Sequence, residues 1–241
     1  MRKVLNVLIF LGITYPYGVL SGIIFWALSS LNLIKVRHFE RFPRGQEKII
    51  LVSNHPSLLE PFLLPALFFW DYFWHPFKFA PWSTPDKSNF YDRWYWFWVR
   101  PRIVPVDRSD ERKEARSVVQ MKNILDSNGI IILFAEGGRT CFGERFQYSS
   151  SGKRVRELKN GVGWLVLKTG AVVLPVWVDG PEKVLPNSPD RKKLFCPPRL
   201  DGIITIKIGG MIRFATESSY LDKEQVTSII TGGLLKLADE E

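Results

Sequence analysis

Short apolar runs alternate with longer amphipathic stretches along most of this chain. Apolar runs bounded by polar or turn-forming residues are typical of buried strands. We expect strands at "KIILVS" (48–53), "FKFAP" (77–81), "RIVPV" (102–106), "IIILF" (130–134), "AVVLPVWV" (171–178) and "GIITIKIGG" (202–210). Segments with apolar residues at helical spacing predict helices at 58–69, 111–129, 157–170 and 221–239. The glycine at 129 is typical of a helix end.

The order of these predicted elements indicates a fold class. Strands separated by helices are typical of βαβ units, in which the strands are parallel and helices cover the sheet. We therefore predict an α/β fold with a largely parallel sheet, antiparallel strands at its edges and flanking helices. No linker divides the chain after the first forty residues, so residues 41–241 are expected to form one domain.

The first forty residues have a different pattern, because no charged residue occurs between Val4 and Ile34. Roughly 20 apolar residues suffice to span a bilayer. We predict that residues 1–40 are a hydrophobic membrane-anchoring arm. Because "YPYG" (15–18) interrupts the arm, it is either one tilted span or two short helices that dip into one leaflet. The basic residues that follow it predict a domain on the cytoplasmic side, and they are Lys35, Arg37, Arg41 and Arg44.

Two other interpretations of this arm are a signal peptide and a buried core helix. "MRK" is a basic start and "ALS" (27–29) resembles a cleavage site. The apolar region of a signal peptide is normally about 7 to 15 residues long, and this one is longer. The core-helix interpretation stays open on the sequence alone.

Aromatic residues gather in two further segments, "FFWDYFWHPFKFAPW" (68–82) and "RWYWFWVR" (93–100). Aromatic side chains with scattered Lys and Arg are typical of positions at lipid headgroup level. The same side chains also fit the lining of a channel for an acyl chain, or an aromatic-rich core. All three interpretations remain open.

The chain is basic, with a net charge of +9 and 17 Phe, 9 Trp and 7 Tyr among its 241 residues. This charge favours an anionic partner, which is nucleic acid, an anionic lipid surface or a phosphorylated substrate. No recognised nucleic-acid motif accompanies it, so we expect no nucleic-acid partner. The two cysteines, Cys141 and Cys196, form no disulfide framework and indicate a reducing compartment.

Several chemistries lack their motifs in this sequence. It contains no GxSxG elbow and no phosphate-binding loop of the GxxxxGK[ST] type. The three histidines, His38, His55 and His75, lie in different segments, so we predict no metal site.

Candidate chemistry begins at "NHPSLLEP" (54–61). Ser57 and Glu60 fit a capping box, in which Glu60 accepts the backbone N–H of Ser57. His55 has no part in such a cap, and it follows a predicted strand, where open α/β sheets bind ligands. The segment is therefore a helix start with an incidental histidine, or it holds a catalytic His55–Glu60 pair. Five positions span about 140° on an ideal helix, so direct contact requires His55 to lie in a turn, which Pro56 favours.

A second candidate site is "FAEGGRT" (134–140), which also follows a predicted strand. Gly137 and Gly138 would let backbone N–H groups approach an anion, and the guanidinium of Arg139 fits two phosphate oxygens. The other interpretation is an exposed turn with an incidental pairing of Arg139 and Glu136. Arg108 supplies another cation just after the strand predicted at 102–106.

In order and spacing, four blocks of this chain resemble those of the glycerolipid acyltransferases, the lysophosphatidic acid acyltransferase superfamily. "NHPSLLEP" resembles the His-(x)4-Asp block, and "RIVPVDR", "FAEGGRT" and "VVLPVWV" resemble the second, third and fourth blocks. The resemblance covers about residues 48–215 and implies a glycerol-3-phosphate acyltransferase-like fold. It also implies acyl transfer from acyl-CoA or acyl carrier protein to a lysophospholipid hydroxyl. The expected reaction converts 1-acyl-glycerol-3-phosphate to phosphatidic acid, with no metal or cofactor besides the co-substrate.

The resemblance implies a role for each candidate residue. His55 is expected to take the proton of the acceptor hydroxyl, and Glu60 to hold the imidazole tautomer. The acceptor phosphate is expected to contact Arg139 and the backbone of Gly137 and Gly138, with Arg108 assisting. Glu136 is expected to orient Arg139 or the acceptor, and Pro175 to shape the pocket.

Two departures from the family pattern stand out. Glu60 replaces the usual aspartate, and the extra methylene is expected to shift the imidazole by about an ångström, which can cost about a hundredfold in rate. Ala135 and Gly138 replace the usual proline and threonine of the third block. The alternatives are therefore a catalytically impaired, membrane-bound lipid-binding homologue, or an acyltransferase for a different glycerol-derived or lysolipid acceptor.

Overall fold

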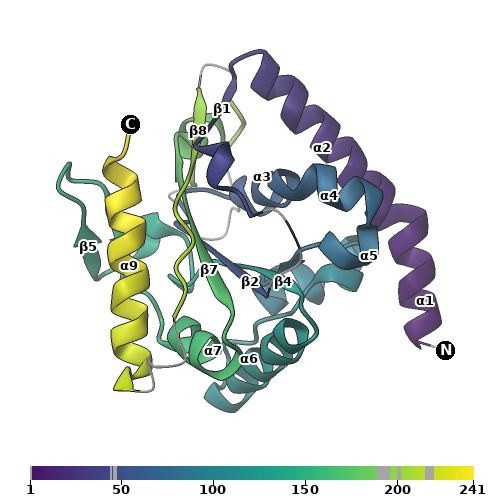
Figure 1. Cartoon of the computed structure of the whole chain (residues 1–241). Helices are drawn as coiled ribbons and strands as arrows, with labels where there is room; N and C mark the ends of the chain where they lie inside the picture. Colours follow the sequence, from purple (N-terminus) through teal and green to yellow (C-terminus); the bar gives the residue numbers. More distant parts are fainter. Residues whose placement is uncertain (1, 44, 46–47, 189–195, 200–201, 215–219) are drawn as a thin grey trace.

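A computed structural model describes residues 2–43, 45, 48–188, 196–199, 202–214 and 220–241. Six strands form one sheet in the order β1–β8–β7–β2–β4–β3 (Figure 1). They are β1 (Ile34–Arg37), β2 (Ile49–Ser53), β3 (Trp82–Ser83), β4 (Ile130–Leu133), β7 (Val172–Asp179) and β8 (Ile204–Ile208). A separate hairpin pairs β5 (Phe146–Tyr148) with β6 (Arg154–Arg156).

The sheet is mixed, as predicted. Strands β3, β4, β2 and β7 are parallel neighbours, whereas β8 is antiparallel to β7 and parallel to β1. Strands β8 and β1, which run opposite to the other four, therefore lie together at one edge of the sheet. The carboxyl ends of β2 and β4 are adjacent, which brings the segments after them, including "NHPSLLEP" and "FAEGGRT", to the same edge of the sheet.

Helices cover both faces of the sheet (Figure 1). The helices are α1 (Arg2–Ile9), α2 (Tyr15–Ser30), α3 (Glu60–Leu63), α4 (Phe69–Trp74), α5 (Pro76–Phe79), α6 (Glu111–Asp126), α7 (Gly161–Thr169), α8 (Pro181–Val184) and α9 (Lys223–Asp239). Ile50 and Val52 pack with α6, α7 and α9, while Ile49 and Leu51 pack against the opposite layer. This division follows because successive side chains of a strand point to opposite faces, and burial on both faces explains the uninterrupted apolar run of β2.

Two of the predicted strands are wrong. The segment "FKFAP" (77–81) overlaps a helix, α5, which begins at Pro76 and ends at Phe79. Proline suits the first turn of a helix. The strand β3 follows at Trp82. "RIVPV" makes only isolated bridges, from Ile103 to Ser83 and from Val106 to Asp86. Val104 and Val106 donate to the carbonyls of Ser83 and Pro85, but Pro85 has no N–H to return to the Val104 carbonyl between them, so no continuous ladder forms.

The helix predicted at 58–69 is broken into three pieces. Helix α3 is followed by a 3-10 segment, Leu64–Phe68, and then by α4. Pro65 has no N–H to donate to the carbonyl of Pro61, which interrupts α-helical bonding. The predicted helix 111–129 ends at Asp126, and Asn128, with φ of 57°, takes the left-handed position in place of Gly129.

The N-terminal arm is a continuous helical run and not a hairpin. A π-helical segment, Phe10–Thr14, joins α1 to α2, just before Pro16. Among the described residues, one helix is long and apolar enough to cross a membrane, at Val4–Ser30, and only 17% of an apolar 18-residue stretch of it is buried. That exposure contradicts the core-helix interpretation. Arg44, one of the basic residues expected after the arm, lies outside the described residues.

Glycines let the arm pack closely on the domain. A Cβ on Gly22 would lie 2.2 Å from the Phe69 ring, and one on Gly18 would lie 2.7 Å from the Tyr72 ring. Real Cβ contacts are not that short, so these positions require glycine for α2 to approach α4. Helix α2 of the arm therefore packs directly on α4, in the same layer of helices as α3.

Candidate active site

His55 and Glu60 form a direct pair. Nδ1 of His55 lies 2.8 Å from Oε2 of Glu60, whose side chain has no exposed surface. His55 lies in the turn after β2, and α3 begins at Glu60 itself. The predicted break between the two residues is present, and it overcomes the unfavourable five-residue spacing.

The second carboxylate oxygen of Glu60 holds the turn. Oε1 accepts the backbone N–H of Ser57 at 2.9 Å, as the capping box predicts. The Ser57 hydroxyl accepts from the N–H of Leu59 at 3.0 Å, just outside the helix. The cap and the His55 pair are therefore two contacts of one carboxylate. The extra methylene of Glu60, relative to aspartate, does not separate the pair.

Phe134 fixes the plane of the imidazole. Its ring is stacked on His55 with centroids 4.3 Å apart and an interplanar angle of 23°. Phe134 follows β4, the neighbour of β2, which explains the contact. With Nδ1 on Glu60, the lone pair of the neutral ring is on Nε2. Nε2 makes no hydrogen bond with any described residue, and His55 lines a cavity.

Glu136 lies beneath this turn and not in contact with Arg139. It is 2% exposed, and Oε1 accepts from the N–H of His55 at 2.7 Å and from the Thr140 hydroxyl at 2.7 Å. Oε2 accepts from the N–H of Arg156 at 2.9 Å. Burial raises the pKa of Glu136, and these three donors oppose that rise. In this structure the carboxylate ties the two sequence blocks together from inside, and the expected role of Glu136 in orienting Arg139 or the acceptor stays a prediction.

The glycine turn is only partly available to an anion. Gly137 has φ of 71°, and its N–H donates to the carbonyl of Phe134 at 3.1 Å. That donor closes the turn, so the predicted contact of Gly137 with an anion is not supported. Gly138 and Arg139 line the same cavity as His55, and their contact with a phosphate stays a prediction.

Asn187 is a site residue that sequence reasoning missed. Its Oδ1 accepts from Nη1 of Arg139 at 2.8 Å, and its Nδ2 donates to the carbonyl of Pro56 at 2.6 Å. The Arg139 guanidinium also lies over the Phe142 ring at 4.6 Å. Asn187 lies in the segment after the carboxyl end of β7. Ligands bind at that edge of an open α/β sheet, so this position could have marked Asn187 as a candidate from the sequence.

Arg108 lines the cavity and lies near Asp86, with Nη1 3.5 Å from Oδ2. Pro175 has a different place from the one predicted. It lies within β7, where its ring and carbonyl contact Gly209, and it does not line the cavity. In the part of the chain that the structure describes, no group of three His, Cys, Asp or Glu side chains is placed to hold a metal ion.

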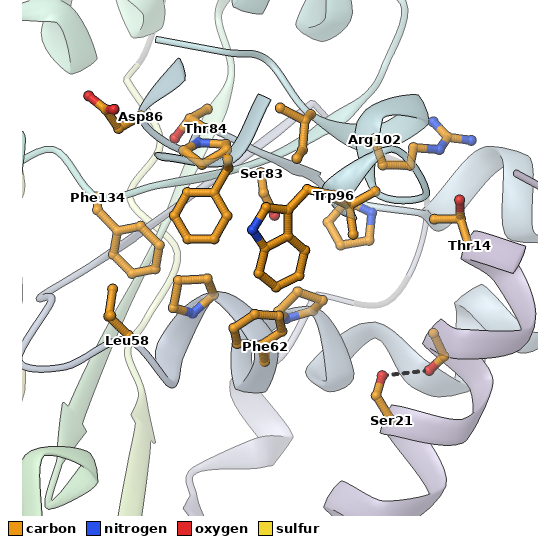
Figure 2. Close-up of a pocket in the computed structure, with 18 of the residues that line it drawn as sticks. Thr14, Ser21, Leu58, Phe62, Ser83, Thr84, Asp86, Trp96, Arg102 and Phe134 are labelled. Carbon is orange, nitrogen blue, oxygen red and sulfur yellow. Dashed lines mark hydrogen bonds between the residues drawn. The ribbon is translucent and has the colours of Figure 1, made fainter. Parts of the chain in front are cut away.

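A cavity of about 280 Å³ connects the His55 turn to the N-terminal helix. Figure 2 shows it between Phe134 and Leu58 at one end and Thr14 and Ser21 at the other. Its apolar lining includes Leu58, Pro61, Phe62, Pro65, Ala66, Phe69, Phe90, Trp96, Trp98 and Val99. The aromatic segments 68–82 and 93–100 therefore contribute side chains to this cavity, and a channel for an acyl chain stays a prediction.

Arg102 lies at the end of this cavity nearest the arm. Its guanidinium lies 4.6 Å from the centroid of Phe10 and 5.1 Å from that of Trp82, and it donates to the carbonyl of Phe77 at 3.2 Å. Burial lowers the pKa of Arg102 to about 10, so the side chain stays charged at neutral pH.

Comparisons with known proteins show the family and the fold of this chain. The acyltransferase family model matches residues 33–179. The chloroplastic 1-acyl-sn-glycerol-3-phosphate acyltransferase LPAT1 of Arabidopsis thaliana is 24% identical over 156 residues, which are 64% of this chain and 38% of that protein. The chain thus spans well under half the length of that relative.

The fold is similar to a solved structure. The crystal structure of the 1-acyl-sn-glycerophosphate (LPA) acyltransferase PlsC from Thermotoga maritima matches with a TM-score of 0.57 and 19% identity, over 100% of this chain and 99% of that one. This likeness confirms the predicted fold class. Because the family model covers more than half of the 241 residues, the chain belongs to the acyltransferase family, as its sequence blocks predicted.

Proposed function

We propose that this enzyme transfers a fatty acyl group from a thioester donor to the free hydroxyl of a lysophospholipid. The preferred acceptor is 1-acyl-glycerol-3-phosphate, and the product is phosphatidic acid. The observation that carries the proposal is the 2.8 Å pair of His55 and Glu60 at the end of an apolar cavity, beside Arg139. The named activities of the two relatives, both 1-acyl-glycerophosphate acyltransferases, support the choice of acceptor.

His55 acts as the general base. The pKa of an alcohol lies far above that of imidazole, so Nε2 takes the hydroxyl proton as the oxygen attacks the thioester carbonyl carbon. Glu60 keeps the proton on Nδ1 and stabilises the imidazolium that forms. As the new C–O bond is completed, the C–S bond breaks, and the departing sulfur takes the proton back from Nε2. The acyl group passes directly between substrates, with no acyl-enzyme intermediate.

The acceptor's phosphate lies beside Arg139 and Gly138. Asn187 and Phe142 hold the Arg139 guanidinium in place, which limits the entropy lost when it binds an anion. Arg108 adds positive charge near the same end of the cavity, although Asp86 offsets part of it.

The cavity takes the acyl chain, and the arm brings both substrates to it. Large aromatic side chains beside the arm are exposed: Trp70 is 57%, Trp74 72% and Phe77 56% exposed. A bilayer would cover these residues together with the outer face of Val4–Ser30. Residues 1–40 would thus anchor the catalytic domain, 41–241, on the cytoplasmic side, and lipid tails would enter the cavity from the leaflet.

A catalytically impaired lipid-binding homologue is less well supported. Two departures from the family pattern, Glu60 and Ala135, motivate it, and Glu60 reaches both His55 and Ser57 at hydrogen-bonding distance. The donor carrier, coenzyme A or acyl carrier protein, is left to experiment.

A panel assay tests the proposal. The full chain, purified in detergent, is offered 1-acyl-glycerol-3-phosphate, lysophosphatidylcholine and monoacylglycerol, each with acyl-CoA or acyl carrier protein, and products are measured by mass spectrometry. Phosphatidic acid is expected as the main product. Transfer to monoacylglycerol with an equal kcat/KM would contradict a phosphate-bearing acceptor.

A further inference from the structure

The hairpin β5–β6 brings the side chain of Arg156 to Gly138. The backbone N–H of Arg156 is fixed on Glu136 at 2.9 Å, directly under the glycine turn. From there, Nη1 of Arg156 extends to within 2.8 Å of the point that a Cβ on Gly138 would occupy. Gly138 lines the cavity, so this guanidinium lies at the edge of the site.

Two glycines make room for this one side chain. A Cβ on Gly143 would lie 2.5 Å from Cγ of Arg156, and one on Gly138 would lie 2.8 Å from its Nη1. Separations below 3.0 Å are essentially never seen for a real Cβ. Because Nη1 is the far end of a flexible side chain, a side chain at position 138 would displace the guanidinium, and the glycine that departs from the family pattern leaves it in place.

The guanidinium of Arg156, like that of Arg154, has no ion-pair partner among the described residues. Three neighbouring cations have carboxylate partners, since Arg145 pairs with Glu157, Lys153 with Asp179 and Lys159 with Glu114. Among the described residues, no carboxylate forms an ion pair with the guanidinium of Arg156. An arginine without such a partner, beside a second arginine at position 139, favours an anionic ligand.

We infer that Arg156 is a second phosphate-binding arginine, which makes the site selective for acceptors with a terminal phosphate monoester. This inference rests on the proposed acyl transfer. A monoester presents three terminal oxygens and about −1.5 to −2 charge at pH 7. A phosphodiester headgroup presents two such oxygens and one charge, so it gains less from a second guanidinium.

The test compares Arg156→Gln with Arg154→Gln, a matched control. Arg154 is on the same strand, two residues away, and its guanidinium lies over the Phe146 ring at 4.4 Å. Each variant acylates lysophosphatidic acid and lysophosphatidylglycerol in mixed micelles. For Arg156→Gln, KM for lysophosphatidic acid is expected to rise about tenfold with little change in kcat, and KM for the diester to rise less. Arg156→Lys should restore part of the loss, and Arg154→Gln should match the wild type.

A double-mutant cycle adds a second measurement. Gly138→Thr places a Cβ against Nη1, so it should displace Arg156 and raise the same KM, and the double variant should be little worse than either single variant. Equal KM in Arg156→Gln and Arg154→Gln, or equal losses for monoester and diester, would overturn the inference. If the wild type acylates no acceptor, the proposed function fails instead. Lysophosphatidic acid binding by the wild type and Arg156→Gln, measured by calorimetry, then tests the phosphate site by itself.

Discussion

Glu60 binds Nδ1 of His55 with one carboxylate oxygen, at 2.8 Å, and holds the Ser57 N–H of the same turn with the other. The pair and the turn that shapes it therefore depend on a single buried side chain. A carboxylate that does both is sensitive to its length and to its charge.

Glu60→Gln should abolish the correct tautomer while keeping the side-chain length. An amide can turn its NH₂ toward His55, which then places the imidazole proton on Nε2, where no base remains. We expect kcat to fall by about a thousandfold or more. Glu60→Asp, too short to make both contacts, should lose about 10- to 100-fold. Steady-state kinetics of both variants measure this, and full activity of Glu60→Gln would exclude the tautomer role.

Glu136→Gln should destabilise the junction of the two blocks. The amide NH₂ would face one of the three donors that Glu136 now accepts, at a cost of about 1–3 kcal/mol in the free energy of unfolding. Chemical denaturation at neutral pH measures the difference. An unchanged unfolding midpoint would show that these hydrogen bonds contribute little.

The free energies of unfolding of the wild type and of Glu136→Gln should also depend differently on pH. Because burial raises the pKa of Glu136 in the folded state, the unfolded chain loses that proton first as pH rises. Between the unfolded pKa, about 4.3, and the higher folded value, the wild type should lose stability relative to Glu136→Gln. If the wild type instead gained stability relative to Glu136→Gln as pH rises through that window, the pKa of Glu136 would not be raised in the folded state.

Asn187→Ala should remove one of the contacts that hold the Arg139 guanidinium. Its loss removes the 2.8 Å partner of the guanidinium and leaves the Pro56 carbonyl without its 2.6 Å donor. KM for a phosphate-bearing acceptor should rise about tenfold, with a smaller change in kcat. Asn160→Ala is the matched control, because Asn160 bonds Glu224 away from the cavity. Similar KM values in the two variants would remove Asn187 from the site.

Ser21→Phe should change chain-length preference. Ser21 lines the arm end of the cavity, so a larger side chain there shortens the space for the acyl chain. Each methylene excluded from an apolar site costs about 0.8 kcal/mol, so activity with long-chain donors should fall about tenfold while medium-chain donors are spared. Ser30→Phe, on the same helix but outside the cavity, is the control. Equal losses for both donor lengths would argue against a chain-binding cavity.

Much of the site was readable in the sequence because its parts are local. The His55–Glu60 pair lies within one turn, and Gly138 and Arg139 follow one strand. Asn187 was missed because it bonds Pro56, 131 positions away in sequence, and only the folded sheet brings the two segments together. The approach of Arg156 depends on a hairpin without a strong sequence pattern.

Proline placement explains most errors in the predicted elements. Hydrophobic spacing predicted one helix at 58–69, but the missing N–H of Pro65 divided it. The same physics left "RIVPV" with isolated bridges, because Pro85 on the opposing segment has no N–H for the Val104 carbonyl. The inward placement of Glu136 was not predicted for another reason, because a carboxylate next to an arginine in sequence can point inward, toward backbone N–H groups.

The most direct measurement is phosphatidic acid formation by the wild type beside His55→Ala, with His75→Ala as a histidine control on the exposed surface. Circular dichroism establishes that each variant is folded. If Nε2 of His55 is the general base, kcat of His55→Ala should fall by at least about a hundredfold, and His75→Ala should match the wild type. A folded His55→Ala protein that forms phosphatidic acid at the wild-type rate would contradict catalysis by this histidine.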